Sequence, residues 1–409
     1  MHDLFYLSLC LIPFVTCLWL YPLMKRQFAA EVNDNGKIST IDGLRGVAAT
    51  AVIVHHGILM TNLFVDSHWE INAGYVADFS SLVHRVLTQL GSFGVTVFFM
   101  ITGYLFWTKA LKNGVGQVSV FYRRRLFRLV PMYLVAVTGV YLLSSVIGFT
   151  ERMDAHYLVK SLSSWLSFGF IKGETLTDHK PGWLILCGVF WTLAIEIKFY
   201  VLFPLLASRF AQGRPRLGAL AWTVVVLLLL HWSAVISSVQ FSILFAFICG
   251  MMTATLQTFP GFCAETAAIN RRPWLKTLMG IVALAAIGLG FYLFDFAYNG
   301  LAVLLIGLFF IITATGNDLW GLLNARPLRF SGLISYSTYL LHGLVLSASF
   351  TWVYPRLGAM AALGIAFVGV IVLSALSYLK IEKPFMALGH RKPEACSGQT
   401  QGGPSYLER

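Results

Sequence analysis

Long apolar stretches recur along this 409-residue chain and limit the folds it can adopt. A helix needs about 20 apolar residues to cross the hydrocarbon core of a bilayer, because each residue adds only about 1.5 Å. Such stretches occur at 4–24, 46–63, 91–108, 129–149, 183–207, 217–233, 237–258, 277–294, 298–315, 332–350 and 357–378. Charged residues make up only 12% of the chain, whereas about 25% is usual in a soluble domain. The sequence predicts an all-α polytopic membrane protein with about 11 transmembrane helices.

The lysines and arginines predict how these helices are oriented. They concentrate in every second connection, for example in "RRRLFR" at 123–128, and are sparse in the connections between. Because basic connections stay in the cytoplasm, the pattern predicts an N-terminus outside and a C-terminus in the cytoplasm. The same rule explains the net charge of +12, with anionic membrane lipids at the basic ends. We therefore expect no nucleic-acid partner.

Composition divides the chain into four parts. We expect an N-terminal transmembrane anchor at 1–26; a cleaved signal peptide is the alternative, although no basic segment precedes the apolar one. Residues 27–41 are a polar linker, and residues 42–390 form one membrane domain. Residues 391–409 are predicted to be a disordered cytoplasmic tail. The six cysteines show no metal-ligand spacing, so no metal site is expected.

The stretch "LRGVAATAVIVHHG", residues 44–57, places an arginine and two histidines in an apolar segment. His56 follows Arg45 by eleven residues, which returns a helix to within about 20° of the same face and roughly 16 Å deeper. His55 points to another face and is expected to pack. Because buried charge in a bilayer costs several kcal/mol, such residues usually face a cavity and mark a functional site. We expect a chemical role for His56.

Two further segments place ionisable groups at a similar depth. "FWTLAIEIKFYVLFP" carries Glu196, with Tyr200 one turn later, and "RFSGLISYSTYLLHG" carries His342, with Tyr339 on the same face. For His342, a structural hydrogen bond between helices and a chemical role are both open. We expect Glu196, His56 and His342 to form one polar centre. The same groups would also suit a proton-coupled transporter.

The basic cluster in "FYRRRLFRLVPMY" lies at the inner end of a predicted helix. The positive-inside rule alone explains some of its arginines. However, Arg125 and Arg128 lie one turn apart, and arginines with this spacing beside a cavity can clamp a phosphate. We expect Arg124, Arg125 and Arg128, together with Arg45, to bind a phosphate-bearing ligand from the cytoplasm.

Five segments in order resemble the membrane-bound acyltransferase-3 family of bacterial integral-membrane O-acyltransferases. They are "STIDGLRGVAATAVIVHH", "GVTVFFMITGYLFW", "FYRRRLFRLVPMY", "WTLAIEIKFYVLFPLL" and "ISYSTYLLH", and the resemblance covers roughly residues 38–390. It implies a ten-helix acyltransferase core after one extra span, in the bacterial inner membrane. It also implies transfer of an acyl group, commonly acetyl, from cytoplasmic acyl-coenzyme A to a hydroxyl of a carbohydrate or glycolipid of the cell envelope. Polysaccharide-assembly proteins would be further partners.

The resemblance places the family's motifs on particular residues. Its arginine and histidine signature falls on Arg45 and His56, and its RxxR pair on Arg125 and Arg128. Its remaining motifs fall on Phe98, Phe99, Thr102 and Gly103, and on Trp191 and Glu196. Thr102 stands where serine is usual and keeps the hydroxyl, and Lys198 stands where an uncharged residue is common.

These assignments lead to one chemical hypothesis. His56 would be the general base on the acceptor hydroxyl, with Glu196 orienting it or stabilising its protonated form. Tyr339 or Thr102 would donate a hydrogen bond to the thioester oxyanion. An acyl-histidine intermediate is a variant of this mechanism. Contacts with substrate are expected from Trp191, Tyr200 and His342. The alternative function is a proton-coupled transporter of a lipid-linked or sugar substrate.

Overall fold

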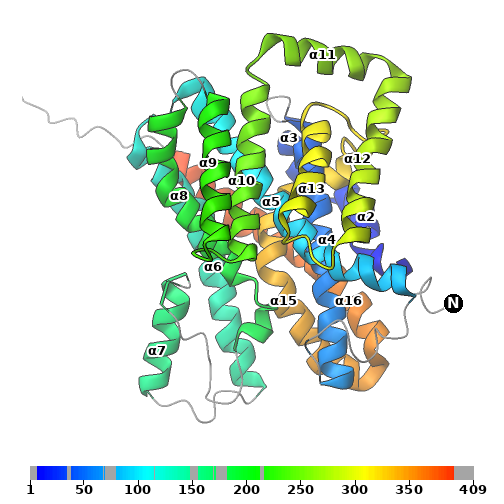
Figure 1. Ribbon diagram of the computed structural model, residues 1–409. Helices are drawn as coiled ribbons and strands as arrows, with labels where there is room; N and C mark the ends of the chain where they lie inside the picture. Colours follow the sequence, from blue (N-terminus) through cyan, green and yellow to red (C-terminus); the bar gives the residue numbers. More distant parts are fainter. Residues whose placement is uncertain are drawn as a thin grey trace, which may run out of the picture.

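The structure is a computed structural model, and it describes residues 7–34, 38–67, 69, 80–114, 116–147, 155–168, 170–171, 182–211 and 216–390. Within these ranges the chain is helical and contains no strand. Figure 1 shows most helices side by side, running between two ends of the molecule. The predicted tail 391–409 and residues 35–37 of the predicted linker lie outside the described residues.

Seven helices of the described chain are long and apolar enough to cross a membrane. They are α4 (Ser39–Asp66), α5 (Ser81–Asn113), α6 (Val118–Val146), α8 (Phe190–Phe210), α10 (Ser238–Leu256), α12 (Pro273–Leu293) and the continuous run Tyr354–His390. That run joins α16 (Tyr354–Ser377), the π-helix η3 (Tyr378–Glu382) and α17 (Lys383–His390). The predicted multi-pass helical membrane protein is thereby confirmed.

The remaining apolar stretches form bent or short helices. Leu7–Leu23, which contains α2 (Ile12–Leu23), meets α3 (Lys25–Val32) at a bend of 104°, and α14 (Arg326–Leu333) meets α15 (Ser335–Trp352) at 73°. Counting each bent pair as one span gives up to nine spans in the described residues. Two shorter apolar helices are α9 (Arg216–Trp232) and α13 (Gly300–Ala314). The count of 11 stays a prediction.

The predicted span at 183–207 is not one continuous helix. A short 3-10 helix, η2 (Gly182–Leu186), and a turn precede α8, and Cys187 and Gly188 have φ angles of 53° and 68°. Gly343 of α15 lets η2 approach closely, because a Cβ there would lie 2.4 Å from the Leu186 carbonyl carbon. Non-helical backbone at membrane depth is tolerated where protein buries it or where it lines a cavity. Here Leu186 and Cys187 are buried by protein, and Cys187 and Gly188 line a cavity.

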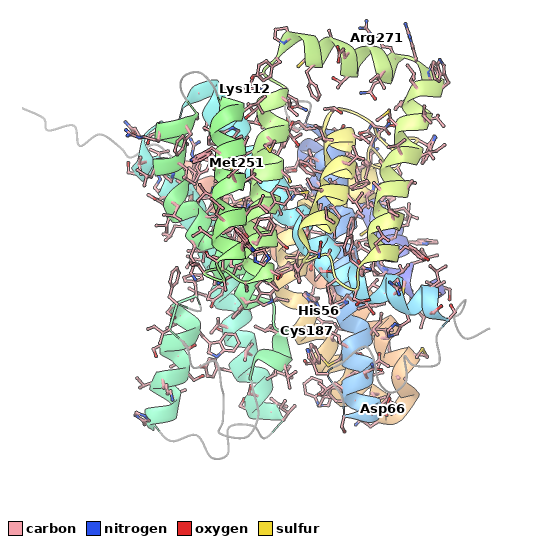
Figure 2. The ribbon with its side chains drawn as sticks, viewed as in Figure 1. His56, Asp66, Lys112, Cys187, Met251 and Arg271 are labelled. Carbon is pink, nitrogen blue, oxygen red and sulfur yellow. The ribbon has the colours of Figure 1, made fainter. Side chains whose placement is uncertain are left out.

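Labelled charged residues mark the two ends of the molecule. Figure 2 places Lys112 and Arg271 at one end, here called the basic end, and Asp66 at the opposite end. The cytoplasmic connection predicted between two spans contains α11 (Pro260–Arg271), which lies across the basic end (Figure 1). His56 and Cys187 lie between the two ends (Figure 2). At the other end, α7 (Ala155–Leu166) packs through Trp165, whose ring contacts Phe190 at 4.7 Å.

Glycines allow α4 to approach α14 at backbone distance. A Cβ on Gly332 would lie 1.8 Å from the carbonyl oxygen of Asp42, and one on Gly46 would lie 2.4 Å from that of Leu328. Small residues of this kind allow membrane helices to pack closely. An ion pair of 3.9 Å between Arg329 and Asp42 joins the same two helices. Close packing therefore fixes the basic end of α4, where Arg45 lies.

A second glycine contact fixes α5 against α10. A Cβ on Gly103 would lie 2.2 Å from the Phe247 carbonyl oxygen, and one on Gly250 would lie 2.0 Å from that of Met100. Beside this contact, Trp107 Nε1 donates a 2.9 Å hydrogen bond to a threonine hydroxyl of α10. The glycine of the "FFMITG" segment therefore has a packing role.

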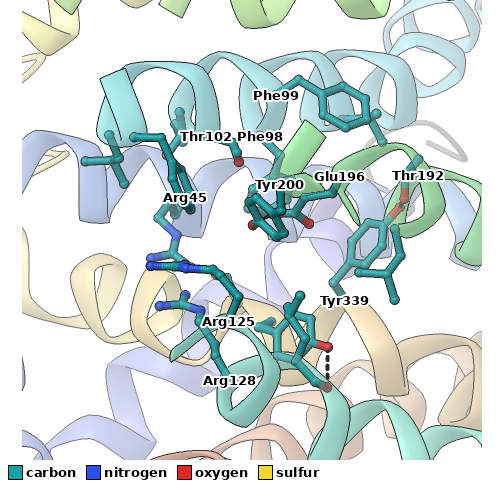
Figure 3. A pocket seen from close by; sticks show the side chains of 18 of the residues that line it. Arg45, Phe98, Phe99, Thr102, Arg125, Arg128, Thr192, Glu196, Tyr200 and Tyr339 are labelled. Atoms are coloured by element: carbon teal, nitrogen blue, oxygen red, sulfur yellow. Dashed lines mark hydrogen bonds between the residues drawn. The ribbon is translucent and has the colours of Figure 1, made fainter. Parts of the chain in front are cut away.

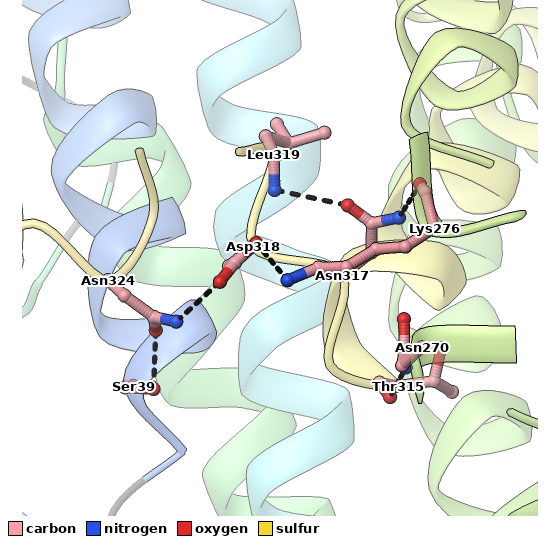
Figure 4. A network of polar contacts seen from close by, with 8 residues as sticks. All are labelled: Ser39, Asn270, Lys276, Thr315, Asn317, Asp318, Leu319 and Asn324. Carbon is pink, nitrogen blue, oxygen red and sulfur yellow. Dashed lines mark hydrogen bonds and ion pairs between the residues drawn. The ribbon is translucent and has the colours of Figure 1, made fainter. Parts of the chain in front are cut away.

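A polar network joins α12, the connection after α13, and α4 at the basic end (Figure 4). Lys276 Nζ lies 2.6 Å from Asp318 Oδ1, and Asn324 donates to Asp318 Oδ2 at 3.0 Å. Ser39 then donates to Asn324 Oδ1 at 2.6 Å. Partial burial raises the pKa of Asp318, but the hydrogen bond from Lys276 and a backbone N–H outweigh burial and hold it below its ordinary value.

The glycine contact between α4 and α14 predicts a stability loss for Gly332→Ala. Because the new methyl would meet backbone rather than a flexible side chain, the two helices must separate, at a cost of about 1–3 kcal/mol. We expect a lower Tm for the detergent-purified variant. Gly288→Ala on α12 is the matched control, since nothing lies within 4 Å of its Cβ position. Equal melting of both variants and the wild type would contradict the close approach of α4 and α14.

Candidate functional site

A first cavity, here called the arginine cavity, has a volume of about 310 Å³ and lies among α4, α5, α6, α8 and α15 (Figure 3). Apolar rings, among them Phe98 and Phe106, form part of its wall. Its polar lining consists of Arg45, Thr102, Lys109, Arg125, Arg128, Thr192, Glu196, Tyr200, Ser335, Tyr336 and Tyr339. Cationic groups therefore outnumber acidic ones in a cavity with apolar walls.

Three arginines of this cavity carry unpaired positive charge. Arg125 and Arg128 project from the same face of α6 because they lie one turn apart, and Arg45 reaches them from α4 (Figure 3). The Arg125 guanidinium lies 4.5 Å from the centre of the Phe106 ring, which holds it over an aromatic face. In the described part of the chain, none of the three forms an ion pair. Charge held this way in an apolar surrounding favours an anionic ligand.

Glu196 lies in the arginine cavity and is bonded within its own helix. The Tyr200 hydroxyl, one turn later on α8, donates a hydrogen bond to the Glu196 carboxylate. The Tyr200 ring in turn lies 5.8 Å from the Arg125 guanidinium. The carboxylate, the phenol and the guanidinium therefore form one connected group on the wall of the arginine cavity.

A second cavity, here called the histidine cavity, has a volume of about 490 Å³. His55 and His56 of α4 line it, together with the turn at Cys187 and Gly188. Trp191 adds an exposed indole ring, which meets the Tyr298 ring edge to face at 6.0 Å. This cavity lies farther along α4 from the basic end than Arg45 does.

His56 belongs to a chain of hydrogen bonds that fixes its tautomer. His342 Nδ1 lies 3.1 Å from the carbonyl oxygen of Thr338, and a carbonyl only accepts, so this nitrogen carries the proton. The Nε2 of a neutral His342 is then an acceptor, and it lies 2.9 Å from His56 Nδ1. His56 Nδ1 therefore donates, and its Nε2 keeps a free lone pair. A histidine oriented this way is ready to accept a proton.

The two cavities meet at three shared side chains, Val95, Thr192 and Tyr339. The Tyr339 hydroxyl hydrogen-bonds the Thr192 hydroxyl, as the adjacent positions of both residues in Figure 3 indicate. Thr192 donates its own proton to the Val189 carbonyl at 2.8 Å, so Tyr339 is the donor in their contact. A neutral hydrogen bond of this kind contributes only about 0.5–1.5 kcal/mol.

The expected single polar centre is wrong in its membership. His56 and His342 do meet, but Glu196 lines the arginine cavity and bonds to Tyr200 instead of orienting His56. The first turn of α8 lines the histidine cavity through Trp191 and Thr192, whereas Glu196 lies about one turn farther along and lines the arginine cavity. His342, for which two roles were open, is the residue that orients His56.

Other expected site residues divide between the cavities. Thr102 and Tyr200 line the arginine cavity, Trp191 lines the histidine cavity, and Tyr339 lines both. Arg124 is corrected: it points about 100° away from Arg125, its Cα faces Gly389 of α17, and it does not line the arginine cavity. Chemical roles for all of these residues stay predictions.

Three features of the site were missed by sequence reasoning. Thr192 and Val95 give no signal, because single small residues in apolar segments are typical of packed membrane helices. The cavity-lining turn at Cys187 and Gly188 was hidden within an apolar run. Gly188 was the only local indication of a break in that run. His55 packs as expected, with Nδ1 3.1 Å from the Leu87 carbonyl oxygen.

The fold and the site together define a multi-pass helical membrane protein with two polar cavities that meet inside the bundle. The family described as Acyltransferase domain matches residues 38–379, which is most of the chain and includes every residue of the two cavities. The chain belongs to this acyltransferase family, which confirms the resemblance found in its motifs.

Relatives support the same family. The chain is 28% identical to the "Putative membrane-bound transacylase BcsY" of Komagataeibacter xylinus, over 87% of this chain and 85% of that protein. It is 25% identical to the "Exopolysaccharide production protein ExoZ" of Rhizobium meliloti (strain 1021), over 74% of this chain and 92% of that protein. It is 23% identical to the "Putative O-acetyltransferase SACOL0978" of Staphylococcus aureus (strain COL), over 86% of this chain and 58% of that protein. The chain thus spans little more than half the length of that relative. No solved structure matches the chain.

Proposed function

We propose that this protein is an O-acyltransferase that moves an acyl group, acetyl in the first instance, from cytoplasmic acyl-coenzyme A to a hydroxyl outside. The observation that carries the proposal is the meeting of two unlike cavities inside a chain of the acyltransferase family. One cavity presents unpaired arginines, and the other presents a histidine with a free lone pair. A donor and an acceptor could therefore bind from opposite sides and react where the cavities meet.

The arginine cavity fits an acyl-coenzyme A donor. Coenzyme A carries its phosphates at one end and its thioester at the end of a long arm. Arg45, Arg125 and Arg128 would hold the phosphates through charge-assisted hydrogen bonds, and the Arg125 Nε, buried without a hydrogen-bond partner, is available to such a ligand. The arm would extend along the apolar rings toward Thr192. The basic end of the bundle would face the cytoplasm in this arrangement.

His56 would act as the general base. The acceptor hydroxyl loses its proton to His56 Nε2 as its oxygen bonds to the thioester carbon, and the carbon–sulfur bond breaks. His56 then returns the proton to the leaving thiolate, so that coenzyme A departs as the thiol. His342 is a positioning residue, because its Nε2 accepts the hydrogen bond from His56 Nδ1–H and so stabilises the imidazolium. The aspartate of a Ser-His-Asp triad accepts a hydrogen bond from its histidine in the same way.

Glu196 would have a positioning role on the donor side. Its carboxylate holds the Tyr200 phenol, and the Tyr200 ring faces Arg125. Thr102, in the same cavity, and Tyr339, at the boundary, would donate to the developing thioester oxyanion, Tyr339 after it releases Thr192. Trp191, on the acceptor side, offers an indole face of the kind on which sugar rings stack.

The acceptor class rests on the relatives. One is named as an exopolysaccharide production protein, and others are named as O-acetyltransferases or as a transacylase. We therefore propose a carbohydrate or glycolipid of the cell envelope as the acceptor, in a bacterial inner membrane, with polysaccharide-assembly proteins as partners. The N-terminus would lie outside and the C-terminus in the cytoplasm.

The donor site predicts a loss of binding in the double variant Arg125→Ala/Arg128→Ala. Each arginine contributes a charge-assisted hydrogen bond of about 1.5–3 kcal/mol, so losing both should weaken acetyl-coenzyme A binding by about 100-fold or more. A thermal-shift titration of detergent-purified protein measures this change. The control is Arg123→Ala/Arg124→Ala, which removes the same charge outside the arginine cavity. If both double variants bind acetyl-coenzyme A like the wild type, the arginines at 123–128 do not bind the donor, and the positive-inside rule alone explains them.

The hydrogen-bond chain predicts different effects at its two histidines. His56→Ala should lower the rate of acyl transfer by about 10²–10⁴-fold while acetyl-coenzyme A still binds. His342→Ala should lower kcat with little change in the donor KM, and His342→Gln should restore part of the rate, because its amide oxygen can accept from His56 Nδ1.

Transfer of radiolabelled acetyl to inside-out membrane vesicles of the native host, which contain the acceptor, measures both effects. Full activity of correctly inserted His56→Ala would exclude the proposed base. If the protein is a transporter, vesicles with and without it should transfer the same amount of acetyl to the acceptor.

A further inference from the structure

The boundary between the two cavities is made of side chains from three different helices. Val95 comes from α5, Thr192 from α8 and Tyr339 from α15, and each lines both cavities. Among the described residues no other side chain lines both. A group that passes from the arginine cavity to His56 therefore has to pass these three residues.

Contacts with neighbouring residues support the boundary on each side. Tyr339 donates to Thr192, and Thr192 is anchored to the Val189 carbonyl. The Tyr339 ring meets the Phe98 ring edge to face at 6.1 Å and lies 5.9 Å from the His342 ring. Val95 is only 7% exposed, so its methyl groups lie inside the bundle, between the two cavities. Aromatic packing and hydrogen bonds to Thr192 and to the Val189 carbonyl, the latter at 3.4 Å, hold Tyr339 at the boundary.

We propose that Val95, Thr192 and Tyr339 select the length of the transferred acyl group and restrict the enzyme to a short one. This inference rests on the proposed acyl transfer from coenzyme A to a hydroxyl. The thioester carbon has to lie at the boundary for an acceptor held by His56 to reach it. The acyl chain then extends from that carbon into the space beside the three side chains. An acetyl group needs room for one methyl only, whereas a butyryl group needs room for two further methylenes.

Size selection of this kind has a known scale. One extra methylene in an apolar pocket changes enzyme specificity by roughly 10- to 200-fold. Val95→Ala removes two methyl groups from the boundary, and Thr192→Ser removes one while it keeps the hydroxyl that Tyr339 contacts. Widening the boundary should therefore favour longer donors, and more strongly in Val95→Ala.

A two-donor competition tests the inference. Inside-out vesicles of the native host, lacking its own copy and producing wild type or a variant, receive equal amounts of [14C]acetyl-coenzyme A and [3H]butyryl-coenzyme A. The ratio of butyryl to acetyl transferred should rise about tenfold or more in Val95→Ala, and by a smaller factor in Thr192→Ser. Val97→Ala is the matched control, because Val97 is fully buried on the same helix and lines neither cavity of the described structure.

The outcomes separate this inference from the function on which it rests. Transfer that depends on the chain, with the same donor ratio in wild type, Val95→Ala and Thr192→Ser, overturns the size selection and leaves the acyltransferase intact. An equal rise in Val97→Ala also overturns it, because general loosening of the core would then explain the effect. No transfer of either label by wild type overturns the proposed function and the inference together. If Val95→Ala fails to insert, the milder Thr192→Ser decides.

Discussion

The structure depends on one constraint: a polar group inside an apolar bundle needs a partner or a cavity, because the bilayer offers neither water nor counter-ions. The chain meets this constraint in two ways. His342 is fully buried and uses both ring nitrogens, one toward the Thr338 carbonyl and one toward His56. The arginines of the first cavity instead remain without ion pairs and face open space. The first arrangement orients a base, and the second attracts an anion.

Helix α4 connects these two arrangements. It carries Arg45 into the arginine cavity and His56 into the histidine cavity, eleven residues farther along one helix. Glycine contacts with α14 fix its basic end, and the contact with His342 fixes its middle. The break before α8 supplies the remaining wall, because a helix continuing through Cys187 and Gly188 could not present its turn to His56. Packing at glycines and one broken helix therefore create the two-sided site.

Much of this organisation is readable in the sequence. The apolar stretches predict the helices, and the eleven-residue spacing correctly places Arg45 and His56 at two depths of one helix. The spacing of Arg125 and Arg128 predicts their shared face. Helical periodicity predicts which residues share a face of one helix, but it does not say which neighbouring helix that face meets. For this reason the sequence wrongly groups Glu196 with His56 and wrongly adds Arg124 to the arginine cavity. The partner of Glu196 is Tyr200, one turn away on the same helix.

The residue pattern is sufficient to establish a multi-pass helical membrane protein and its family, and it predicts that basic residues gather at one end. These properties follow from local composition and from motifs in order. The packing of the helices is needed to show that His342 hydrogen-bonds His56, that Glu196 lines the arginine cavity, and that Val95, Thr192 and Tyr339 lie between the two cavities. Each of these relations joins residues of different helices. Such contacts arise only when side chains of several helices pack together.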